Sequence, residues 1–247
     1  MERQLSDRPA ISVLVPAYEA GDFIPTLVES FSTQTMKNFE VVFVDDGSSD
    51  NTFKVIEKCV RKYKNLRITF TSIKHIGCAG ALKTAVDLSL APLCTFVGAD
   101  DWLPDDSLAI ILDAFKKNPE VGYLWTRYEC KMPSQKKWKE GRSKALPRRT
   151  TLKEALLSGW WGALAQDCWR RKQYNKTPGL DPSLPFCVDQ QLAMLFANLG
   201  CPTAHIPKVT YKHIQHNRQM SALHYKDQQA CRKIILERLG GNYKREW

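Results

Sequence analysis

The stretch Val41–Thr52, VVFVDDGSSDNT, constrains the fold of this chain more than any other. Its first four residues are apolar and mostly β-branched, which is typical of a buried strand. Asp45 and Asp46 follow where that strand should end, and Gly47 permits a sharp turn. The polar run up to Asn51 favours the start of a helix. Ligands of open α/β sheets bind at the carboxyl ends of strands, so we expect both acids at a binding cleft, with helix capping as the alternative.

The composition fits a folded enzyme-sized unit. With 247 residues and 43% hydrophobic side chains, the chain can form one large α/β domain or one domain with a small appendage. No apolar run approaches the roughly 18 residues of a spanning helix, and residues 1–7 carry no apolar signal core. The eight cysteines form no Cys-x-x-Cys pair, so we interpret them as reduced, mostly buried thiols of a cytoplasmic protein.

The charge is strongly basic, with 36 lysines and arginines against 26 acids and a net charge of +10. Such a balance favours an anionic partner, which includes a nucleotide, a polyanionic glycan, a membrane face or a nucleic acid. A solvated basic surface without a polymer partner is the alternative.

Strand and helix patterns alternate through the first half of the chain. Strands are predicted at 11–15, 41–44, 66–70 and 93–97, and helices at 23–31, 53–60, 82–88 and 108–115. This order predicts a mostly parallel sheet. Pro16 should end the first strand because it lacks a donor. Tyr18 then stands at a strand tip, where it either stacks on a base or closes the edge of the core.

A second pair of acids, Asp100 and Asp101, follows the fourth predicted strand. Converging carboxylates repel one another, and a hard cation is their usual stabiliser. A divalent metal that bridges protein carboxylates and a diphosphate needs this geometry. The next two acids, Asp105 and Asp106, are expected to cap the following helix.

The segment Lys74–Ala81 carries two glycines, Gly77 and Gly80, at the start of a predicted helix. Small residues there allow a ligand close to the backbone, and a helix N-terminus favours phosphate. Tight packing of the helix on the sheet explains the glycines equally well. Lys74 either faces the phosphates or belongs to an ordinary surface.

The second half is predicted to hold strands at 122–126 and 203–211, a strand edge and polar turn at 168–172, and helices at 151–157, 189–199 and 222–239. Residues 131–149 are basic and expected to be irregular, either as a solvated charge run or as a lid or acceptor-binding loop. Trp160 and Trp161, with Trp102 and Trp125, either wall a sugar-acceptor pocket or pack in the core.

Three stretches together resemble the domains of glycosyltransferase family 2, namely VLVPAY (13–18), VDDGSSDNT (44–52) and ADDWLP (99–104). The resemblance implies the GT-A fold, a Rossmann-like α/β sheet flanked by helices, and inverting transfer from nucleotide-sugar donors. The implied donor-binding residues are Pro16, Ala17, Tyr18, Glu19, Asp46, Lys74, Gly77 and Asp100. Within that set, Tyr18 would stack near the base, Asp46 would hydrogen-bond it, and Asp100 would hold ribose or diphosphate. The resemblance assigns Asp101 to the metal.

Later stretches extend the resemblance. The turn at 179–184 leads to a helix whose first turn carries Asp189, and the family's catalytic base maps onto this residue. His216, five residues before Ser221, matches a late family element and would contact the metal or diphosphate, with His213 as the weaker candidate. The chain also departs from the family pattern, at positions Glu19, His75, Leu82, Lys83, Gly98 and Val188.

We therefore predict one GT-A domain over 1–247, with a nucleotide-sugar half at 9–120, an acceptor half at 121–221 and a closing helix and tail at 222–247. The predicted enzyme is a metal-dependent inverting glycosyltransferase that uses Mn²⁺ or Mg²⁺ and a UDP-sugar. Its acceptor would be a hydroxyl of a glycan, a lipid-linked sugar or another molecule, bound by Trp102, Trp160 and Trp161.

Alternatives stay open. They are a catalytically degenerate binding module, a glycosyltransferase with a nucleic-acid acceptor, and a nucleotidyltransferase with the same strand order. Peripheral contact with the inner face of a membrane is also open.

Overall fold

The computed structural model describes residues 8–132, 134–141, 143–160, 165–184 and 186–240. Its strands are β1 (Ile11–Ala17), β2 (Phe39–Asp45), β3 (Arg67–Ser72), β4 (Leu93–Phe96), β5 (Tyr123–Lys131), β6 (Lys139–Glu140), β7 (Ala165–Arg170) and β8 (Thr203–Ile214). Its helices are α2 (Ile24–Ser32), α3 (Thr52–Lys62), α4 (Cys78–Leu88), α5 (Ser107–Lys117), α6 (Leu152–Leu157), α7 (Arg171–Tyr174), α8 (Val188–Leu199), α9 (Met220–Leu223) and α10 (Tyr225–Gly240).

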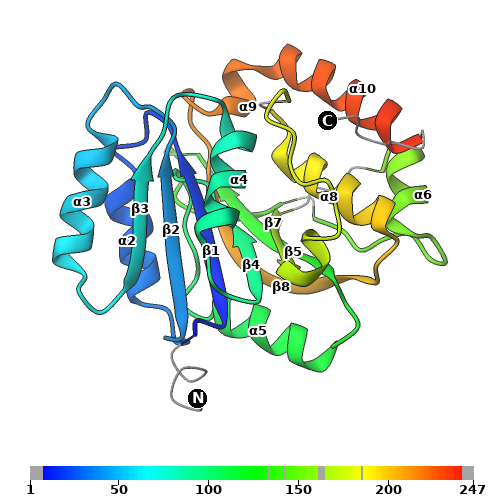
Figure 1. Ribbon diagram of the computed structural model, residues 1–247, viewed down its shortest axis with the longest axis horizontal. Helices are drawn as coiled ribbons and strands as arrows, with labels where there is room; N and C mark the ends of the chain where they lie inside the picture. Colours follow the sequence, from blue (N-terminus) through cyan, green and yellow to red (C-terminus); the bar gives the residue numbers. More distant parts are fainter. Residues whose placement is uncertain (1–7, 133, 142, 161–164, 185, 241–247) are drawn as a thin grey trace.

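The strands form one mixed sheet, in the order β3-β2-β1-β4-β7-β5-β6, with β8 paired to β5 (Figure 1). The first four strands run parallel to one another, as the alternating pattern predicts. β7 is antiparallel to both β4 and β5, and β5 is parallel to β8. The strands that lead to the two acid pairs, β2 and β4, therefore lie in the parallel part of the sheet. The mixed part contains the strands of the second half of the chain.

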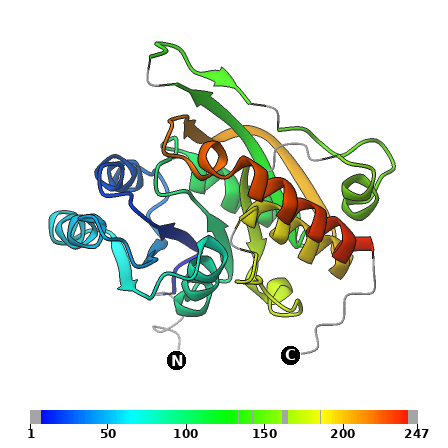
Figure 2. The same ribbon diagram turned by 90° about the horizontal axis from the view of Figure 1, so that it is seen from above.

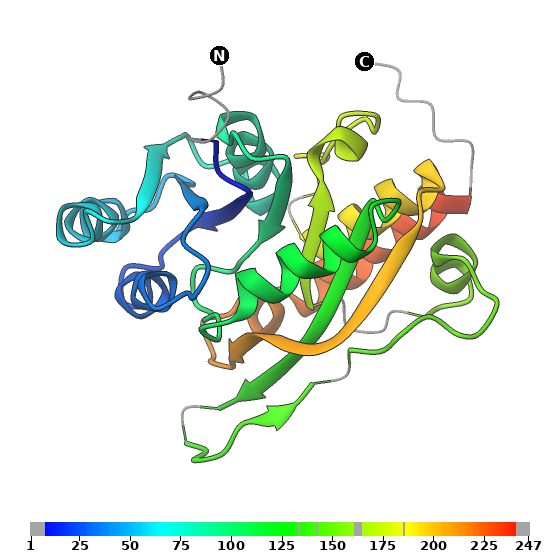
Figure 3. The same cartoon turned by 90° about the horizontal axis from the view of Figure 1, so that it is seen from below.

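Helices cover both faces of the sheet. β1 and β2 are buried along their whole length, which explains why both read as nearly continuous apolar runs. One hydrophobic cluster packs α4, α6, α8 and α10 against one face, and a second packs α2, α3 and α5 against the other. Figure 2 shows α8 and α10 side by side, and Figure 3 shows α5 across the opposite face of the strands.

Turn and cap residues confirm several local predictions. Gly47 adopts a φ of +71° in the turn after β2, and Gly200 ends α8 with a φ of +66°. Both values lie in the left-handed region that glycine tolerates best. Pro25 occupies the first turn of α2, where its missing donor costs nothing.

The prediction that Asp105 and Asp106 cap α5 is wrong for their side chains. Asp106 stands at the N-cap position but makes no capping hydrogen bond. Asp105 instead accepts the hydroxyl of Thr33, at 2.6 Å, and ties this turn to the end of α2. The capping acceptor is Gln34, whose Oε1 takes the N–H of Leu108 at 3.1 Å.

Pro16 does not end the first strand. β1 continues to Ala17, and Pro16 lies in register with Val44 of β2. The pairing of β1 with β4 stops earlier, at Leu14. The proline ring therefore lies beyond that ladder, where a missing N–H costs no hydrogen bond between strands.

The segment 168–172 is not a strand edge followed by a turn. It is the end of β7, which lies inside the sheet between β4 and β5, and it continues into α7. Cys168 and Trp169 are fully buried. Arg171 starts α7 and donates to the carbonyls of Ala91 and Val86, both at 2.8 Å, which fixes the chain where a free turn was expected.

Residues 131–149 are more ordered than predicted. β5 extends to Lys131, and β6 pairs with its end as an antiparallel hairpin. Gly141 donates its N–H to the carbonyl of Tyr128 at 2.8 Å, and a Cβ at position 141 would lie 2.1 Å from the Tyr128 ring. Close contact between the hairpin and this ring therefore requires glycine.

The closing helix begins later than predicted. A four-residue helix, α9, ends at Leu223, and α10 starts at Tyr225. His224 between them has a φ of −119° and a ψ of 35°, which interrupts the helical backbone. Among the described residues, no helix combines the length and apolar character needed to cross a bilayer.

Candidate active site

The two acids at the end of β2 hold loops together at the end of the parallel sheet. Both Asp45 and Asp46 are 2% exposed. Asp46 accepts the backbone N–H groups of Ile76, at 2.8 Å, and Gly77, at 2.9 Å, on its two carboxylate oxygens. The carboxylate predicted to bind a base is thus already engaged in shaping the loop that begins α4.

We expect replacement of Asp46 by Ala to lower the free energy of unfolding by about 2–4 kcal/mol. The reason is that two partly buried N–H donors would lose their charged acceptor. Denaturant unfolding measures the effect. The matched control is Asp87→Ala, which removes an exposed pair with Lys83 and should cost less than about 1 kcal/mol. Equal losses in the two variants would contradict this role.

An aromatic pair forms the rim beside Asp46. Tyr18 is 51% exposed, and its ring lies 4.4 Å from that of His75 between centroids, with an interplanar angle of 32°. His75 also places its Nδ1 atom 3.0 Å from the Asp46 carboxylate. Sequence reasoning identified His75 only as a departure from a family pattern, and this ring contact gives it a place at the rim. Lys74 is exposed on the same loop.

Glu19 has a structural partner at this rim. Its φ of +50° is unusual for a residue with a side chain. Its carboxylate accepts the N–H of Ser49 at 2.8 Å and the hydroxyl of the same residue at 2.9 Å. Glu19 therefore joins the end of β1 to the turn after β2, next to Ala17 and Pro16 at the end of β1.

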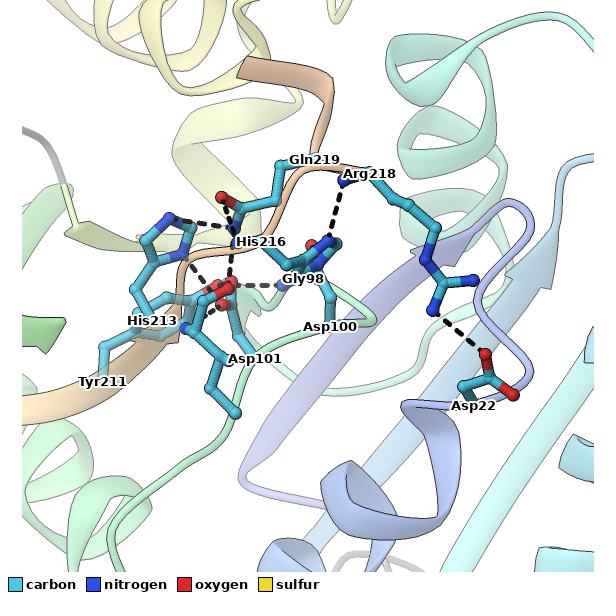
Figure 4. Close-up of polar contacts among 10 residues, drawn as sticks. Asp22, Gly98, Asp100, Asp101, Tyr211, His213, His216, Arg218 and Gln219 are labelled. Atoms are coloured by element: carbon cyan, nitrogen blue, oxygen red, sulfur yellow. Dashed lines mark hydrogen bonds and ion pairs between the residues drawn. The ribbon is translucent and has the colours of Figure 1, made fainter. Parts of the chain in front are cut away.

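The second acid pair lies against the end of β8 (Figure 4). Asp101 is 6% exposed and accepts three hydrogen bonds. The donors are the hydroxyl of Tyr211, the Nδ1 atom of His213 at 2.8 Å and the N–H of Ile214 at 3.3 Å. These contacts attach the loop after β4 to a strand more than a hundred residues later.

Asp100 pairs with the other histidine. The Nε2 atom of His216 lies 3.0 Å from its Oδ2 atom. The N–H of Arg218 points to Nδ1 of His216 at 3.2 Å, so we assign the ring proton to Nε2, which donates to the carboxylate. Burial raises the pKa of Asp100, and the neighbouring charge of Asp101 raises it further.

Further contacts hold this segment over the first half of the chain. Phe23 stacks on the His216 ring at 4.6 Å between centroids, and the guanidinium of Arg218 lies 4.9 Å from the Phe23 ring. Arg218 also pairs with Asp22 at 3.0 Å (Figure 4). The loop after β8 is therefore attached to Asp22, Phe23 and Asp100, all in the first half of the chain.

Asp189 lies in the first turn of α8, as predicted. Burial raises its pKa above the ordinary range for aspartate. Its position relative to the strand tips is indicated by Cys78, the first residue of α4. Burial raises the pKa of that thiol to about 12, and the charges of Asp46, Asp189 and Asp100 add to the increase. The charges of the acids that follow β2 and β4, and of the acid in α8, therefore all influence this thiol at the start of α4.

Asp167 is a second buried carboxyl whose pKa is affected by Asp189. Asp167 on β7 is 1% exposed and accepts the hydroxyl of Tyr123 at 2.5 Å. Burial raises the pKa of Asp167 well above its usual value, and the charge of Asp189 raises it further. Asp167 is not predictable as a site residue from the sequence, because an isolated aspartate within a strand pattern carries no spacing signal.

We expect Asp167→Asn to lower the free energy of unfolding at acidic pH. This loss should shrink as pH rises, and at alkaline pH the variant should be the more stable protein. The folded carboxyl has a raised pKa, so the stability that it contributes is complete below the unfolded value of about 3.9. That stability is lost as pH rises through the folded pKa, whereas the amide does not titrate. Chemical denaturation at pH 5 and pH 9 tests this, with the exposed Asp113→Asn as control. A stability difference independent of pH would contradict it.

The predicted tryptophans separate into two places. Trp102 forms two backbone hydrogen bonds with Lys212, at 3.0 and 2.9 Å, beside Asp101. Trp160 packs edge-on against Trp125, at 5.9 Å between centroids, and Trp125 is fully buried. Trp161 lies outside the described residues. Trp125 is therefore a core residue, whereas Trp102 lies next to the acid pair Asp100 and Asp101.

Comparison with known families identifies the group to which the chain belongs. The model of the family described as Glycosyl transferase family 2 matches residues 12–180. The chain is a member of glycosyltransferase family 2.

Among curated relatives, the chondroitin synthase of Escherichia coli is 27% identical over 213 residues, which cover 86% of this chain and 30% of that protein. The hyaluronan synthase of Pasteurella multocida is 25% identical over the same share of this chain and 21% of its own length. This family 2 chain thus spans less than a third of these two synthases.

Solved structures share the GT-A fold of this family 2 chain. Residues 1–349 of Staphylococcus aureus TarS, in complex with UDP-GlcNAc, give a TM-score of 0.72 at 19% identity, covering 95% of this chain and 68% of that one. The mannosyltransferase PcManGT of Pyrobaculum calidifontis, in complex with GDP-Man and Mn²⁺, gives 0.69 at 18% identity, covering 96% and 66%.

The carboxylates of this family 2 chain are oxygen ligands of the type that suits Mn²⁺ or Mg²⁺, whereas imidazole is a ligand type preferred by softer transition metals. The predicted metal ligands, Asp101 and His216, do not contact each other. Asp101 contacts His213 instead, and His216 contacts Asp100. The described residues contain no cluster of three or more such groups arranged for a metal.

Gly98 marks a departure from the family pattern with a clear local reason. A Cβ at this position would lie 2.6 Å from Oδ2 of Asp101 and 3.3 Å from the hydroxyl of Tyr211. The N–H of Gly98 donates to the hydroxyl oxygen of Tyr211 at 3.0 Å. The contact between Tyr211 and Asp101 therefore occupies the space that a larger residue would need.

Proposed function

We propose that this glycosyltransferase moves a sugar from a nucleotide-diphosphate donor to an acceptor hydroxyl with inversion at the anomeric carbon. The observation that carries the proposal is a set of hydrogen-bonded acids at the carboxyl ends of β2 and β4. Asp46 accepts the N–H of Gly77 just before α4, and Asp100 and Asp101 each contact a histidine at or after the end of β8. Structural neighbours with the same fold were solved with UDP, UDP-GlcNAc and GDP-Man, which supports a nucleotide-sugar donor and favours UDP.

Asp189 acts as the general base in this proposal. Its carboxylate takes the proton of the acceptor hydroxyl while that oxygen attacks the anomeric carbon. The bond from the anomeric carbon to the diphosphate oxygen breaks on the opposite face, and the electron pair leaves with the nucleoside diphosphate. A carboxyl with a raised pKa is a stronger base once ionised, which suits this step.

The strand tips position the donor. Tyr18 and His75 offer exposed aromatic surface for the base, and the loop shaped by Asp46 brings Gly77 and the start of α4 towards the phosphates. Asp100 and Asp101, with His213 near the end of β8 and His216 after it, would hold Mn²⁺ or Mg²⁺. A bound divalent ion would neutralise charge on the departing diphosphate.

Hydrolysis of the donor tests inversion without knowledge of the acceptor, because water can replace the acceptor hydroxyl. UDP-GlcNAc and UDP-glucose carry α-linked sugars, and proton NMR of the first product formed distinguishes the anomers. We expect the β-anomer first and mutarotation afterwards. Appearance of the α-anomer first would contradict inversion.

A binding module without turnover is the second candidate, because Asp101 already accepts three protein hydrogen bonds. In that case a nucleotide-sugar would bind and stay intact, both with water and with acceptor mixtures. Release of nucleoside diphosphate above the rate of the Asp189→Asn variant would exclude the module.

A further inference from the structure

Two tryptophans and two lysines form a compact group beside the acid cluster, and we refer to Trp102, Trp138, Lys131 and Lys212 as the tryptophan–lysine cluster. The indole rings lie 6.0 Å apart between centroids. The Nζ atom of Lys212 lies 4.9 Å from the Trp102 ring and 4.8 Å from the Trp138 ring. The Nζ atom of Lys131 lies 4.9 Å from the Trp138 ring.

The cluster faces the acceptor side of the sheet. Side chains alternate along a strand, so residues 123, 125, 129 and 131 of β5 share one face. Tyr123 and Trp125 on that face pack in the hydrophobic cluster that contains α8, which carries Asp189. Lys212 lies on the same face, because its Nζ atom reaches Glu129 at 3.5 Å. The cluster is therefore on the side of the sheet that holds the proposed base.

The cluster also adjoins the acid pair in the chain. Trp102 follows Asp101 directly, and Lys212 precedes His213 directly. Backbone hydrogen bonds between Trp102 and Lys212 fix these two segments against each other. A ligand on the cluster would thus lie one residue away from the groups proposed to hold the diphosphate.

Positive charge exceeds negative charge on the hairpin of β5 and β6, which carries Lys131 and Trp138 of the cluster. Glu129 is the acid paired with Lys212, and the second acid nearby, Glu140, pairs with Arg127 at 3.0 Å. Lys131 and Lys212 are partly buried, with the Lys212 side chain 20% exposed, so their ammonium groups are less hydrated than those of free surface lysines. The hairpin adds further exposed lysines, at Lys136, Lys137 and Lys139.

We propose that the tryptophan–lysine cluster is a subsite for an acceptor saccharide that carries a negative group, either a carboxylate or a phosphate. The proposal rests on the proposed glycosyltransferase function. Indole surface packs well on the apolar faces of sugar rings, and the ammonium groups that it holds in place can bind the anionic group. A cluster that only anchored the hairpin would need the aromatic contacts but no surplus of lysines over acids.

Isothermal titration of the intact chain tests the proposal with matched probes. One probe is an oligosaccharide of glucuronic acid and N-acetylglucosamine, and the second is its carboxyl-reduced, neutral counterpart. A phosphodiester-linked glycerol oligomer distinguishes phosphate from carboxylate as the source of charge. We expect at least one acidic probe to bind about tenfold more tightly than the neutral one, with a preference that weakens at high salt.

The variant Lys212→Met keeps the packing against both indoles and removes the charge, so it should lose most of the tenfold preference. Lys54→Met, at an exposed position of α3 on the other face of the sheet, should keep it. Thermal unfolding establishes that both variants are folded. Equal affinity of Lys212→Met and Lys54→Met for the acidic probe would overturn the proposal.

Failure of the subsite is distinguishable from failure of the proposed function. If UDP-sugars bind and are hydrolysed but the acidic and neutral probes bind equally, or neither acidic probe binds, the subsite is wrong and the transferase proposal stands. If no nucleotide-sugar binds, the transferase proposal and the subsite that rests on it are both wrong.

Discussion

Replacement of Asp189 by Asn is expected to reduce sugar transfer by about 10²–10⁴-fold, the usual contribution of a positioned general base. The amide has nearly the shape of the carboxylate but cannot accept the acceptor proton. Binding of the donor should be unchanged, because the donor contacts proposed here come from β1, β2, β4 and the loop before α4. Initial rates of nucleoside diphosphate release and calorimetric donor binding give the two readouts.

The matched control for that variant is Asp227→Asn, an exposed acid in the first turn of α10. It should keep both transfer and donor binding within about twofold, as expected for a surface substitution. If Asp189→Asn lost donor binding in parallel with transfer, the residue would be structural and the assignment of the base would be wrong.

Replacement of Asp101 by Ala is expected to lower the free energy of unfolding by about 2–4 kcal/mol, because it breaks a buried hydrogen-bond network. The hydroxyl of Tyr211, the ring of His213 and the N–H of Ile214 would all lose one shared acceptor. Sugar transfer should also fall by at least about 10²-fold, since these contacts fix the segment that carries the diphosphate-side groups.

Tyr211→Phe separates the two effects of Asp101. It removes a single hydrogen bond and should cost about 1 kcal/mol, while the carboxylate and both histidines stay in place. The double variant should lose less than the sum of the single variants, because both changes break the same contact. Additive losses would show that the Tyr211–Asp101 contact contributes no coupling energy.

Much of the parallel half of the fold is predictable from local sequence pattern. The strand of Val41–Val44, the glycine turn and the following helix depend on neighbouring residues, and all three are confirmed. The position of Asp189 in the first turn of α8 depends on the same kind of signal. Such features are local, so a short window of sequence contains most of their cause.

Contacts between residues far apart in the sequence cannot be predicted from local pattern. The partner of Asp101 is Tyr211, which is 110 residues away and has no spacing relation to it. Which histidine meets which acid depends on the pairing of β8, because His213 lies in this strand and His216 in the loop that follows it. The central place of β7 was missed for a similar reason, because the burial of Trp169 comes from layers on both faces.

The hairpin of β5 and β6 is ordered by specific packing contacts that its composition does not predict. Its high lysine content favours an exposed, irregular segment, and the composition alone supports that interpretation. Gly141 against Tyr128 and the aromatic contacts of Trp138 nevertheless bring it to the sheet. A few residues with specific packing thus outweighed the average character of the segment.

Donor binding tests the central claim most directly. The chain would be titrated with UDP-GlcNAc, UDP-glucose and GDP-mannose, each with Mn²⁺, with Mg²⁺ and with a chelator, while thermal unfolding is recorded. We predict that one nucleotide class stabilises the protein only with a divalent ion, by about 2.7 kcal/mol at a ligand concentration of 100 times its Kd. Stabilisation by no donor under any of these conditions would contradict the assignment of the strand tips as a nucleotide-sugar site.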